Sequence, residues 1–241
     1  MNIVYLPVSL PIRLLNQTML VIILTATLWA AHSPPLNAQS TTSNNNEGRY
    51  QVEMIIFNRT TNNEYADKEL WRRDIALSYP QNYQQLTNFQ IVPKSARKLN
   101  NIGNKLQNNR GYRVLFHEAW QQQITEKNTP AVIIRGGDKI SGHRALEGSI
   151  QLRVSRYLHI KTDLWFTAFS VSTDSGIALE KNRWPTLPVL PEDNRQSSDV
   201  STIDSIATFR EKRRMRSEEL HYIDHPILGL LIIITPIKET N

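Results

Sequence analysis

The sequence predicts an α+β protein: a single domain with an antiparallel-rich mixed β-sheet, one main amphipathic helix at about 94–109 packed on it, and long loops. Three observations predict this class. Short segments of strand composition recur along the chain, helical spacing marks one segment, and proline-rich or polar stretches separate the elements. The chain has no cysteine, so packing alone must stabilise the domain, and thiol catalysis is excluded.

The first half of the chain has the order strand, helix, strand. Alternating and then wholly apolar residues at 50–57 (YQVEMIIF) predict the first strand, and 112–120 (YRVLFHEAW) predicts the second. Between them, apolar residues recur every three to four positions, at Ala96, Leu99, Ile102 and Leu106. This spacing predicts an amphipathic helix at 94–109 that covers one face of the sheet. The segment 58–90 shows no clear periodicity.

The middle of the chain is rich in strand patterns. A short strand is predicted at 131–135, and a hairpin follows, formed by 146–160 and 164–171 with its turn at Lys161–Asp163. In the first arm, apolar Ile150, Leu152 and Val154 alternate with Gln151, Arg153 and Ser155. This alternation places the apolar side chains on one sheet face and the polar and basic ones on the other.

The last strands are predicted at 207–222 and 228–237, after an insertion loop at 180–202. Within the insertion, Trp184–Pro191 (WPTLPVLP) has proline at every third position. That repeat is typical of polyproline II and is incompatible with a central strand.

The N-terminus has the features of an export signal. Residues 19–31 (MLVIILTATLWAA) are uncharged and about as long as a signal-peptide core, which is short for a membrane span of about 20 residues. We therefore expect a signal peptide at 1–38, a disordered polar linker at 39–48 and a folded domain at 49–241. Cleavage near Ser33 and an uncleaved N-terminal anchor are the alternatives.

The charge of the chain favours anionic partners. The net charge is +6, and removal of residues 1–38 leaves +5, because Arg13 is the one charged side chain among them. For an exported protein the available polyanions are phospholipid headgroups, acidic glycans and wall peptides. No nucleic acid is expected as a partner.

A basic strip is the first candidate binding site. Every second residue is basic in one segment, at Arg210, Lys212, Arg214 and Arg216. On a strand these side chains would share one face, which would attract the carboxylates of stem peptides or acidic lipid. Residues that could extend the strip on a neighbouring strand are Arg153, Arg156 and Lys161. The alternative is a solvated sheet face balanced by Glu211, Glu218 and Glu219.

Tryptophans are the candidates for stacking on sugar rings. Trp71 lies in the unpatterned segment and Trp184 begins the proline-rich loop, so these two are expected to be exposed. Trp165 lies inside an apolar strand and is expected in the core, and Trp120 is a further aromatic candidate. Ordinary packing is the alternative for Trp71 and Trp184.

His221 and His225 are the candidates for a metal site. On a strand the two imidazoles would lie about 13 Å apart, too far for one ion, although a turn at 224–226 would bring them closer. Further histidines that could complete a set are His117, His143 and His159. No HExxH motif is present, so we expect no metal and no cofactor, and a His-Asp-His-Pro corner hydrogen-bonded to its own loop.

Other catalytic signatures are missing from the sequence. No Gly-x-Ser-x-Gly motif of a serine hydrolase occurs. Gly136-Gly137-Asp138-Lys139 lacks the spacing and the Lys-Ser/Thr pair of a phosphate-binding Walker loop. We therefore expect a protein without a catalytic site.

Four blocks, at 50–57, 111–120, 146–165 and 213–237, resemble the CsiV family of periplasmic peptidoglycan-binding proteins. The resemblance implies a Gram-negative periplasmic protein that binds peptidoglycan. It also implies that the protein assists a class A penicillin-binding protein through its outer-membrane lipoprotein activator. The expected function is thus non-catalytic wall binding that assists cell-wall synthesis. The alternative is a metal-dependent wall amidase or peptidase that uses His221 and His225.

Overall fold

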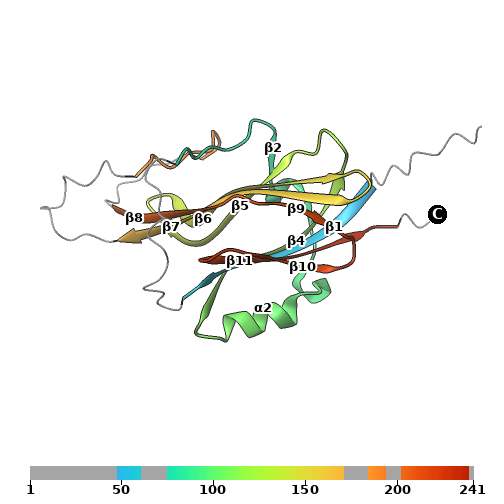
Figure 1. Ribbon diagram of the computed structural model, residues 1–241, viewed down its shortest axis with the longest axis horizontal. Helices are drawn as coiled ribbons and strands as arrows, with labels where there is room; N and C mark the ends of the chain where they lie inside the picture. Colours follow the sequence, from blue (N-terminus) through green and yellow to red (C-terminus); the bar gives the residue numbers. More distant parts are fainter. Residues whose placement is uncertain (1–47, 61–74, 171–183, 194–201, 239–241) are drawn as a thin grey trace, which may run out of the picture. The chain divides into compact units, whose positions relative to one another are not determined.

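The computed structural model describes residues 48–60, 75–170, 184–193 and 202–238, all within one compact unit. Their strands form two sheets that lie face to face (Figure 1). This confirms the predicted α+β class with an antiparallel-rich mixed sheet, and it adds that the strands divide between two sheets. The predicted signal peptide at 1–38 and all but the last residue of the linker predicted at 39–48 lie outside the described residues; that last residue, Gly48, begins a strand. No helix of the described residues is long and apolar enough to cross a membrane.

The first sheet has five strands. In spatial order they are β10 (Leu220–Asp224), β11 (Leu228–Pro236), β1 (Gly48–Arg59), β4 (Tyr112–Ile124) and β3 (Gln90–Ile91), and all neighbours are antiparallel. The central position of β1 explains its apolar sequence, because β1 is flanked by strands on both edges and covered on both faces.

The second sheet has six strands. In spatial order they are β2 (Tyr83–Gln85), β5 (Ala131–Ile140), β6 (His143–Val154), β7 (Leu158–Ser170) and β8 (Thr202–Phe209), and β9 (Lys212–Met215) also pairs with β7. The β2–β5 pair is parallel, and the other pairs are antiparallel. A 3₁₀ turn, η2 (Leu86–Asn88), follows β2.

The main core lies between the two sheets and is built from alternate residues of each strand. From β1 it takes Val52, Met54 and Ile56, and from β6 it takes Ile150, Leu152 and Val154. The alternation predicted for β6 is therefore confirmed: its apolar residues point inward, and Gln151 and Arg153 lie on the outer face.

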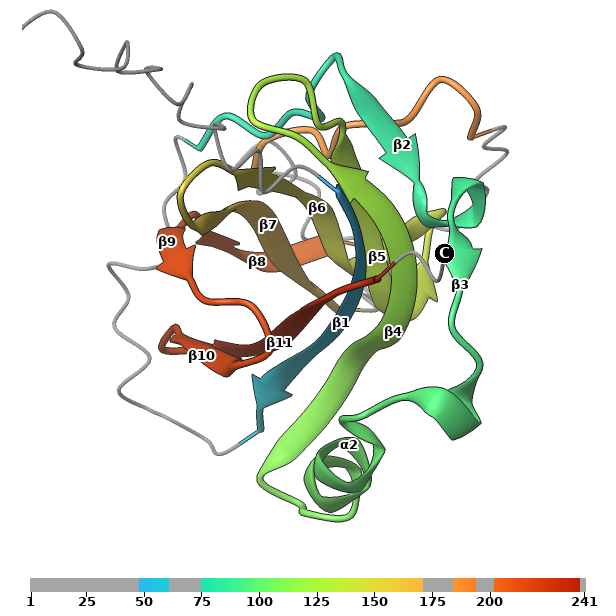
Figure 2. The same cartoon turned by 90° about the vertical axis from the view of Figure 1, so that its right-hand side faces the viewer.

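One α-helix, α2 (Asn100–Gln107), packs on the outer face of the first sheet over Ile55 and Phe57 (Figure 2). It is shorter than the predicted helix, because Lys94–Ala96 forms a separate 3₁₀ turn (η3) and Arg97 is extended. The Arg97 guanidinium donates to the carbonyls of Val92 and His117 and binds Glu118, which holds this residue outside the helix.

The hairpin of β6 and β7 is present, but its turn lies at 155–157 and not at Lys161–Asp163 as predicted. Thr162 is buried inside β7, where its hydroxyl donates to the Phe209 carbonyl (3.0 Å) and accepts from the Glu211 amide (2.8 Å). A polar triplet that suggested a turn is thus a paired strand segment.

The segment predicted as one strand at 207–222 is divided among three. β8 and β9 pair with opposite ends of β7, and β10 crosses to the first sheet to pair with β11. The break between β8 and β9 falls at Arg210 and Glu211, next to the Thr162 hydroxyl that bonds on both sides of it.

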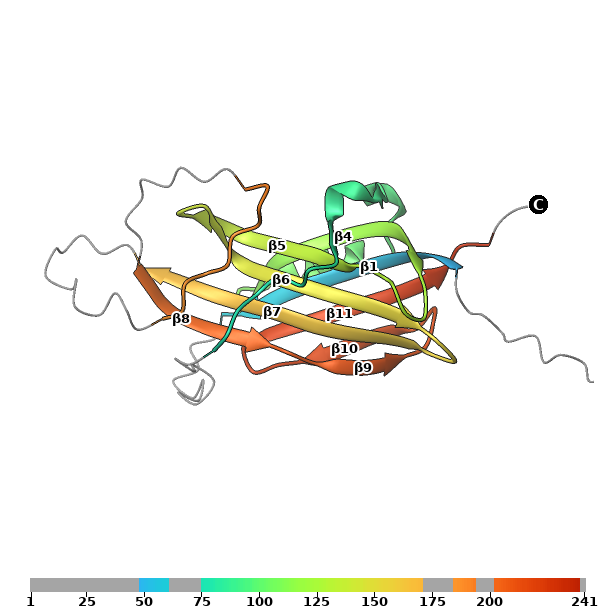
Figure 3. The same cartoon turned by 90° about the horizontal axis from the view of Figure 1, so that it is seen from above.

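A second apolar cluster covers part of the outer face of the second sheet. Its members are Trp165, Leu187 and Ile206, with Ile75, Leu77, Tyr79, Phe169, Trp184 and Ile203 packed around them. Figure 3 looks onto this face and shows the segments 75–82 and 184–193 crossing the strands. The described part of the predicted insertion is therefore packed on the sheet, with Leu187 and Leu190 buried. β8 begins at Thr202, the last residue of that insertion.

Candidate functional site

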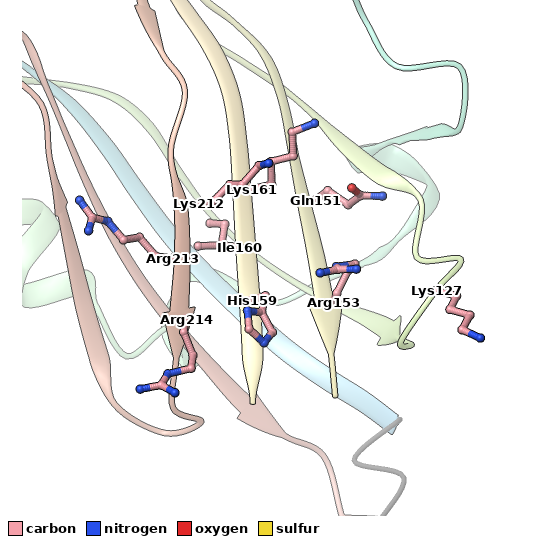
Figure 4. Close-up of a pocket in the computed structure, with 9 residues that line it drawn as sticks. All are labelled: Lys127, Gln151, Arg153, His159, Ile160, Lys161, Lys212, Arg213 and Arg214. Carbon is pink, nitrogen blue, oxygen red and sulfur yellow. The ribbon is translucent and has the colours of Figure 1, made fainter. Parts of the chain in front are cut away.

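The outer face of the second sheet is hollowed near the β6–β7 turn, beside the part that the two segments cover. The hollow has a volume of about 450 Å³ and is lined by Lys127, Gln151, Arg153, His159, Ile160, Lys161, Lys212, Arg213 and Arg214. Figure 4 shows these side chains on three adjacent strands, β6, β7 and β9, with Lys127 on the loop beyond β6. We call this hollow the basic groove.

Strand register brings the cations together. Arg153 of β6 pairs with His159 of β7, which pairs in turn with Arg214 of β9. One step along the groove, Gln151 pairs with Lys161, and Lys161 pairs with Lys212. Side chains directly opposite each other on antiparallel strands have Cβ atoms about 5 Å apart. Two rows of side chains, rich in positive charge, therefore cross the three strands.

In the part of the chain that the structure describes, ion pairing distinguishes the cations of these rows from the cations beside them. Among the described residues, no carboxylate forms an ion pair with Arg153, Lys161, Lys212 or Arg214. Neighbouring cations differ: Arg213 pairs with Glu211 (3.4 Å), and Arg210 pairs with Asp163 (2.8 Å). Like charges opposite each other on a sheet are destabilising, so an anion bound in the groove would relieve their repulsion.

Tyr157, in the turn between β6 and β7, supports the edge of the groove. The Cζ atom of Arg214 lies 4.6 Å from the centre of the Tyr157 ring, and that of Arg156 lies 5.6 Å from it. Cations over an aromatic face are attracted by the ring quadrupole. The ring therefore favours one position of the Arg214 side chain beside the groove.

The predicted basic strip is only partly present as one face. Lys212 and Arg214 lie in β9 and line the groove, but Arg210 and Arg216 lie outside that strand. Arg210 binds Asp163 and the Ala76 carbonyl, and Arg216 lies 3.5 Å from Glu219. The four residues do not form one strip, because the chain leaves the strand on both sides of β9.

The tryptophans are placed as follows. Trp165 is fully buried, as predicted, and Trp120 is also buried, with its indole nitrogen donating to Gln122 (2.6 Å). Trp184 was expected to be exposed but is half-buried, because it packs on the cluster around Trp165. Trp71 lies outside the described residues.

The five histidines considered for the alternative metal site have separate surroundings. His225 Nδ1 accepts hydrogen bonds from the amides of Ile227 and Leu228 (3.3 Å each), so the corner bonds to its own loop as predicted. His221 Nε2 lies 3.1 Å from the backbone of Arg216. His117 lies beside Glu53, His143 lies beside Glu147, and His159 lines the basic groove. Across the described ranges, no group of three or more His, Cys, Asp or Glu residues is placed to hold a metal ion.

The pKa values of two residues in the His225 corner are lowered. The pKa of His225 is lowered mainly because burial disfavours the charged imidazolium. Beside it, hydrogen bonds from Tyr222 and Arg59 lower the pKa of Asp224. This corner stabilises the end of β10 and lies apart from the residues that line the groove.

Some groove residues were not among the sequence candidates. Arg153 and Lys161 were expected to extend the basic strip, and both do line the groove. Lys127 and His159 were missed as binding residues. The alternation of the hairpin carried a signal for His159, which lies two residues from Lys161 on the same face of β7. Lys127 lies on the loop between β4 and β5, and nothing in its local sequence indicates the groove.

The fold and the groove define a class: a two-sheet protein whose outer face carries a cationic site suited to an anionic ligand. The chain belongs to the CsiV family, described as "Peptidoglycan-binding protein, CsiV", whose family model matches residues 18–237. This confirms the resemblance carried by the four sequence blocks. The comparison with curated proteins gave no match, and neither did the comparison with solved structures.

Proposed function

We propose that this chain is a non-catalytic periplasmic protein that binds peptidoglycan through its basic groove and assists cell-wall synthesis. The observation that carries the proposal is the pairing of Lys161 with Lys212, and of His159 with Arg214, without a carboxylate partner among the described residues. The choice of ligand follows from the family, which is described as one of peptidoglycan-binding proteins.

The charge of the groove favours the stem peptides over the glycan strands. The sugar rings of the wall offer hydroxyl and amide groups, whereas the stem peptides carry several carboxylates. Arg and Lys form their strongest hydrogen bonds with such anions. Each exposed contact contributes little, at about 1 kcal/mol or less, so affinity requires several carboxylates on neighbouring peptides.

Location and partnership are inferred from the sequence and the family resemblance. The uncharged run at 19–31 supports export, with 1–38 as the signal peptide and the remainder as the mature protein. Assistance to a class A penicillin-binding protein, through its outer-membrane lipoprotein activator, is proposed from the resemblance. N-terminal sequencing of the protein from fractionated cells tests export: a mature chain beginning at Gln39 supports it, and an intact chain in the cytosol contradicts it.

Binding is tested by co-sedimentation of the purified protein with isolated sacculi. The variant Lys212→Gln/Arg214→Gln removes two groove charges and is expected to lower the affinity about tenfold at low salt, with a smaller effect at high salt. A matched control, Lys94→Gln/Lys105→Gln, removes two exposed charges from η3 and α2 and is expected to bind as the wild type does.

Three results would contradict the proposal or part of it. If the wild-type protein does not co-sediment with sacculi, the peptidoglycan-binding function fails for this chain. If both double variants lose the same affinity, net charge and not the groove determines binding. Release of soluble muropeptides from sacculi by the purified protein would contradict the non-catalytic part of the proposal.

A further inference from the structure

A second hollow adjoins the basic groove on the same sheet face. It has a volume of about 240 Å³, and its lining shares Gln151 and Lys161 with the groove. The other lining residues are Ser78, Pro80, Ala131, Ser149 and Asp163. We call it the polar hollow. It extends the groove along β6 and β7, toward the segment 75–82 that crosses these strands.

The polar hollow differs from the groove because it contains a carboxylate. Asp163 and Lys161 lie two residues apart on β7, so both are on its outer face with Cα atoms about 6.6 Å apart. Asp163 accepts a hydrogen bond from Nε of Arg210 (2.8 Å), and its side chain remains 34% exposed. A carboxylate can accept several hydrogen bonds, so one donor leaves capacity for another.

Hydrogen bonds of Arg210 and Gln151 fix the wall of the hollow. Arg210 also donates to the carbonyl of Ala76, which ties the crossing segment to the Asp163 carboxylate. On the neighbouring strand β6, Ser149 pairs with Asp163. The side-chain amide of Gln151 donates to the Thr129 carbonyl (3.1 Å). The hollow is therefore a preformed polar site with an anion and a cation on one strand, a few ångströms apart.

We propose that the polar hollow binds an α-amino-acid head, in which an ammonium and a carboxylate are attached to the same carbon. Asp163 accepts from the ammonium, Lys161 binds the carboxylate, and the basic groove binds the remaining carboxylates of the same stem peptide. The proposal rests on the proposed function. Within peptidoglycan, the free end of a meso-diaminopimelate side chain carries such a head, whereas a lysine side chain ends in an ammonium alone.

The size of the hollow supports this choice. Sites for drug-sized ligands have volumes of about 300–1,000 Å³, so 240 Å³ suits a small head group better than a disaccharide. Because the hollow offers both an anion and a cation, it should bind a zwitterion more tightly than a ligand that lacks either charge. A ligand without the carboxylate leaves Lys161 unpaired, and a ligand without the ammonium leaves Asp163 with Arg210 as its partner.

The test is calorimetric titration of the full-length protein with three probes. These are a muramyl tripeptide ending in meso-diaminopimelate, the same tripeptide ending in lysine, and free meso-diaminopimelate. We expect the diaminopimelate tripeptide to bind about tenfold more tightly than the lysine tripeptide. Free diaminopimelate should bind more weakly than its tripeptide, because it lacks the carboxylates that occupy the groove. Equal affinity for the two tripeptides, or tighter binding of the free amino acid, would overturn the assignment.

Variants locate the site. Asp163→Asn is expected to reduce the preference for the diaminopimelate tripeptide to about twofold, because it removes the partner of the ligand's ammonium. Lys161→Gln is expected to have the same effect, because it removes the partner of the ligand's carboxylate. The control Asp138→Asn removes a more exposed carboxylate that also pairs with an arginine, Arg113 on β4, and it should keep the preference. If sacculi still co-sediment with the wild-type protein but neither hollow variant changes the preference, this inference fails while the proposed function stands.

Discussion

The guanidinium of Arg214 lies over the ring of Tyr157, with its Cζ atom 4.6 Å from the ring centre. The two residues come from different parts of the chain, since Tyr157 is in the turn between β6 and β7 and Arg214 is in β9. Pairing of β7 with β9 brings them together at the edge of the basic groove. The turn therefore positions a cation of the groove without lining the groove itself.

Replacement of Tyr157 tests this positioning. Tyr157→Leu is expected to lower the affinity for sacculi about threefold, because a cation–π contact at an exposed site contributes about 0.5–1 kcal/mol. The control Tyr112→Leu removes an exposed tyrosine that packs on Phe57, on the other sheet, and should leave binding unchanged. Unchanged affinity of the Tyr157→Leu variant for sacculi would show that the Tyr157 ring is not needed to position Arg214 for binding.

The sequence predicted part of this site through alternation alone. Polar residues at alternate positions of β6 placed Arg153 on the outer face, and both Arg153 and Lys161 were expected beside the basic strip. The limits of β9 were not predictable in the same way. The break before β9 lies beside Thr162, a buried residue of another strand, whose hydroxyl bonds to both Phe209 and Glu211. Such long-range hydrogen bonds leave no local pattern in the sequence.

Gly148 determines how closely β6 and β7 approach beneath the polar hollow. Its φ of 131° is strained for any residue with a side chain, and an added Cβ would collide with the carbonyl oxygen of Asp163. We expect Gly148→Ala to lower the free energy of unfolding by about 3 kcal/mol, as measured by urea denaturation. Gly48→Ala is the control, because a Cβ there meets no atom within 4 Å and should change stability by less than about 0.5 kcal/mol.

Glu53 connects the centre of β1 to the start of α2. Its buried carboxylate accepts hydrogen bonds from the amides of Lys98 (2.6 Å) and Leu99 (2.8 Å) and lies 3.2 Å from His117 Nε2. The helix has no side-chain cap from its own N-cap residue, so a strand residue some 45 positions earlier satisfies these donors. Apolar spacing predicted the helix, but this long-range contact leaves no local pattern, so the predicted start at 94 was too early.

Removal of this carboxylate should release the helix from the sheet. Glu53→Ala is expected to cost about 2–4 kcal/mol of unfolding free energy and to reduce hydrogen-exchange protection of the α2 amides, because buried donors lose their acceptor. Glu53→Gln keeps one acceptor oxygen and should cost less. Glu219→Ala, which removes an exposed carboxylate near Arg216, serves as the control and should change little. Unaltered protection of α2 in Glu53→Ala would contradict the capping role.

Because the pKa of His225 is lowered in the folded protein, we expect the protein to lose stability at mildly acidic pH. Its ring is half-buried and stacks on Phe209 with ring centres 5.1 Å apart. Burial lowers the pKa of His225 in the folded protein, and the charge of Arg59 also lowers it, while a hydrogen bond to the backbone of Thr208 and the charges of Asp224 and Glu211 oppose this. In the unfolded chain the pKa of histidine is about 6.5. As pH falls through that value, the unfolded state therefore binds the proton first.

The sign of the effect follows from this difference. Wherever the unfolded state binds more protons, the free energy of unfolding decreases as pH decreases. The contribution of His225 is complete above about pH 6.5 and is lost progressively until the pH passes below its lowered pKa in the folded state. Urea denaturation at pH 7.5 and 5.5 measures the loss. His225→Asn keeps an acceptor for the Ile227 and Leu228 amides and should show a smaller loss between these two pH values, whereas His221→Asn should retain the His225 contribution. An equal loss in the wild-type protein and in His225→Asn would exclude His225 as its source.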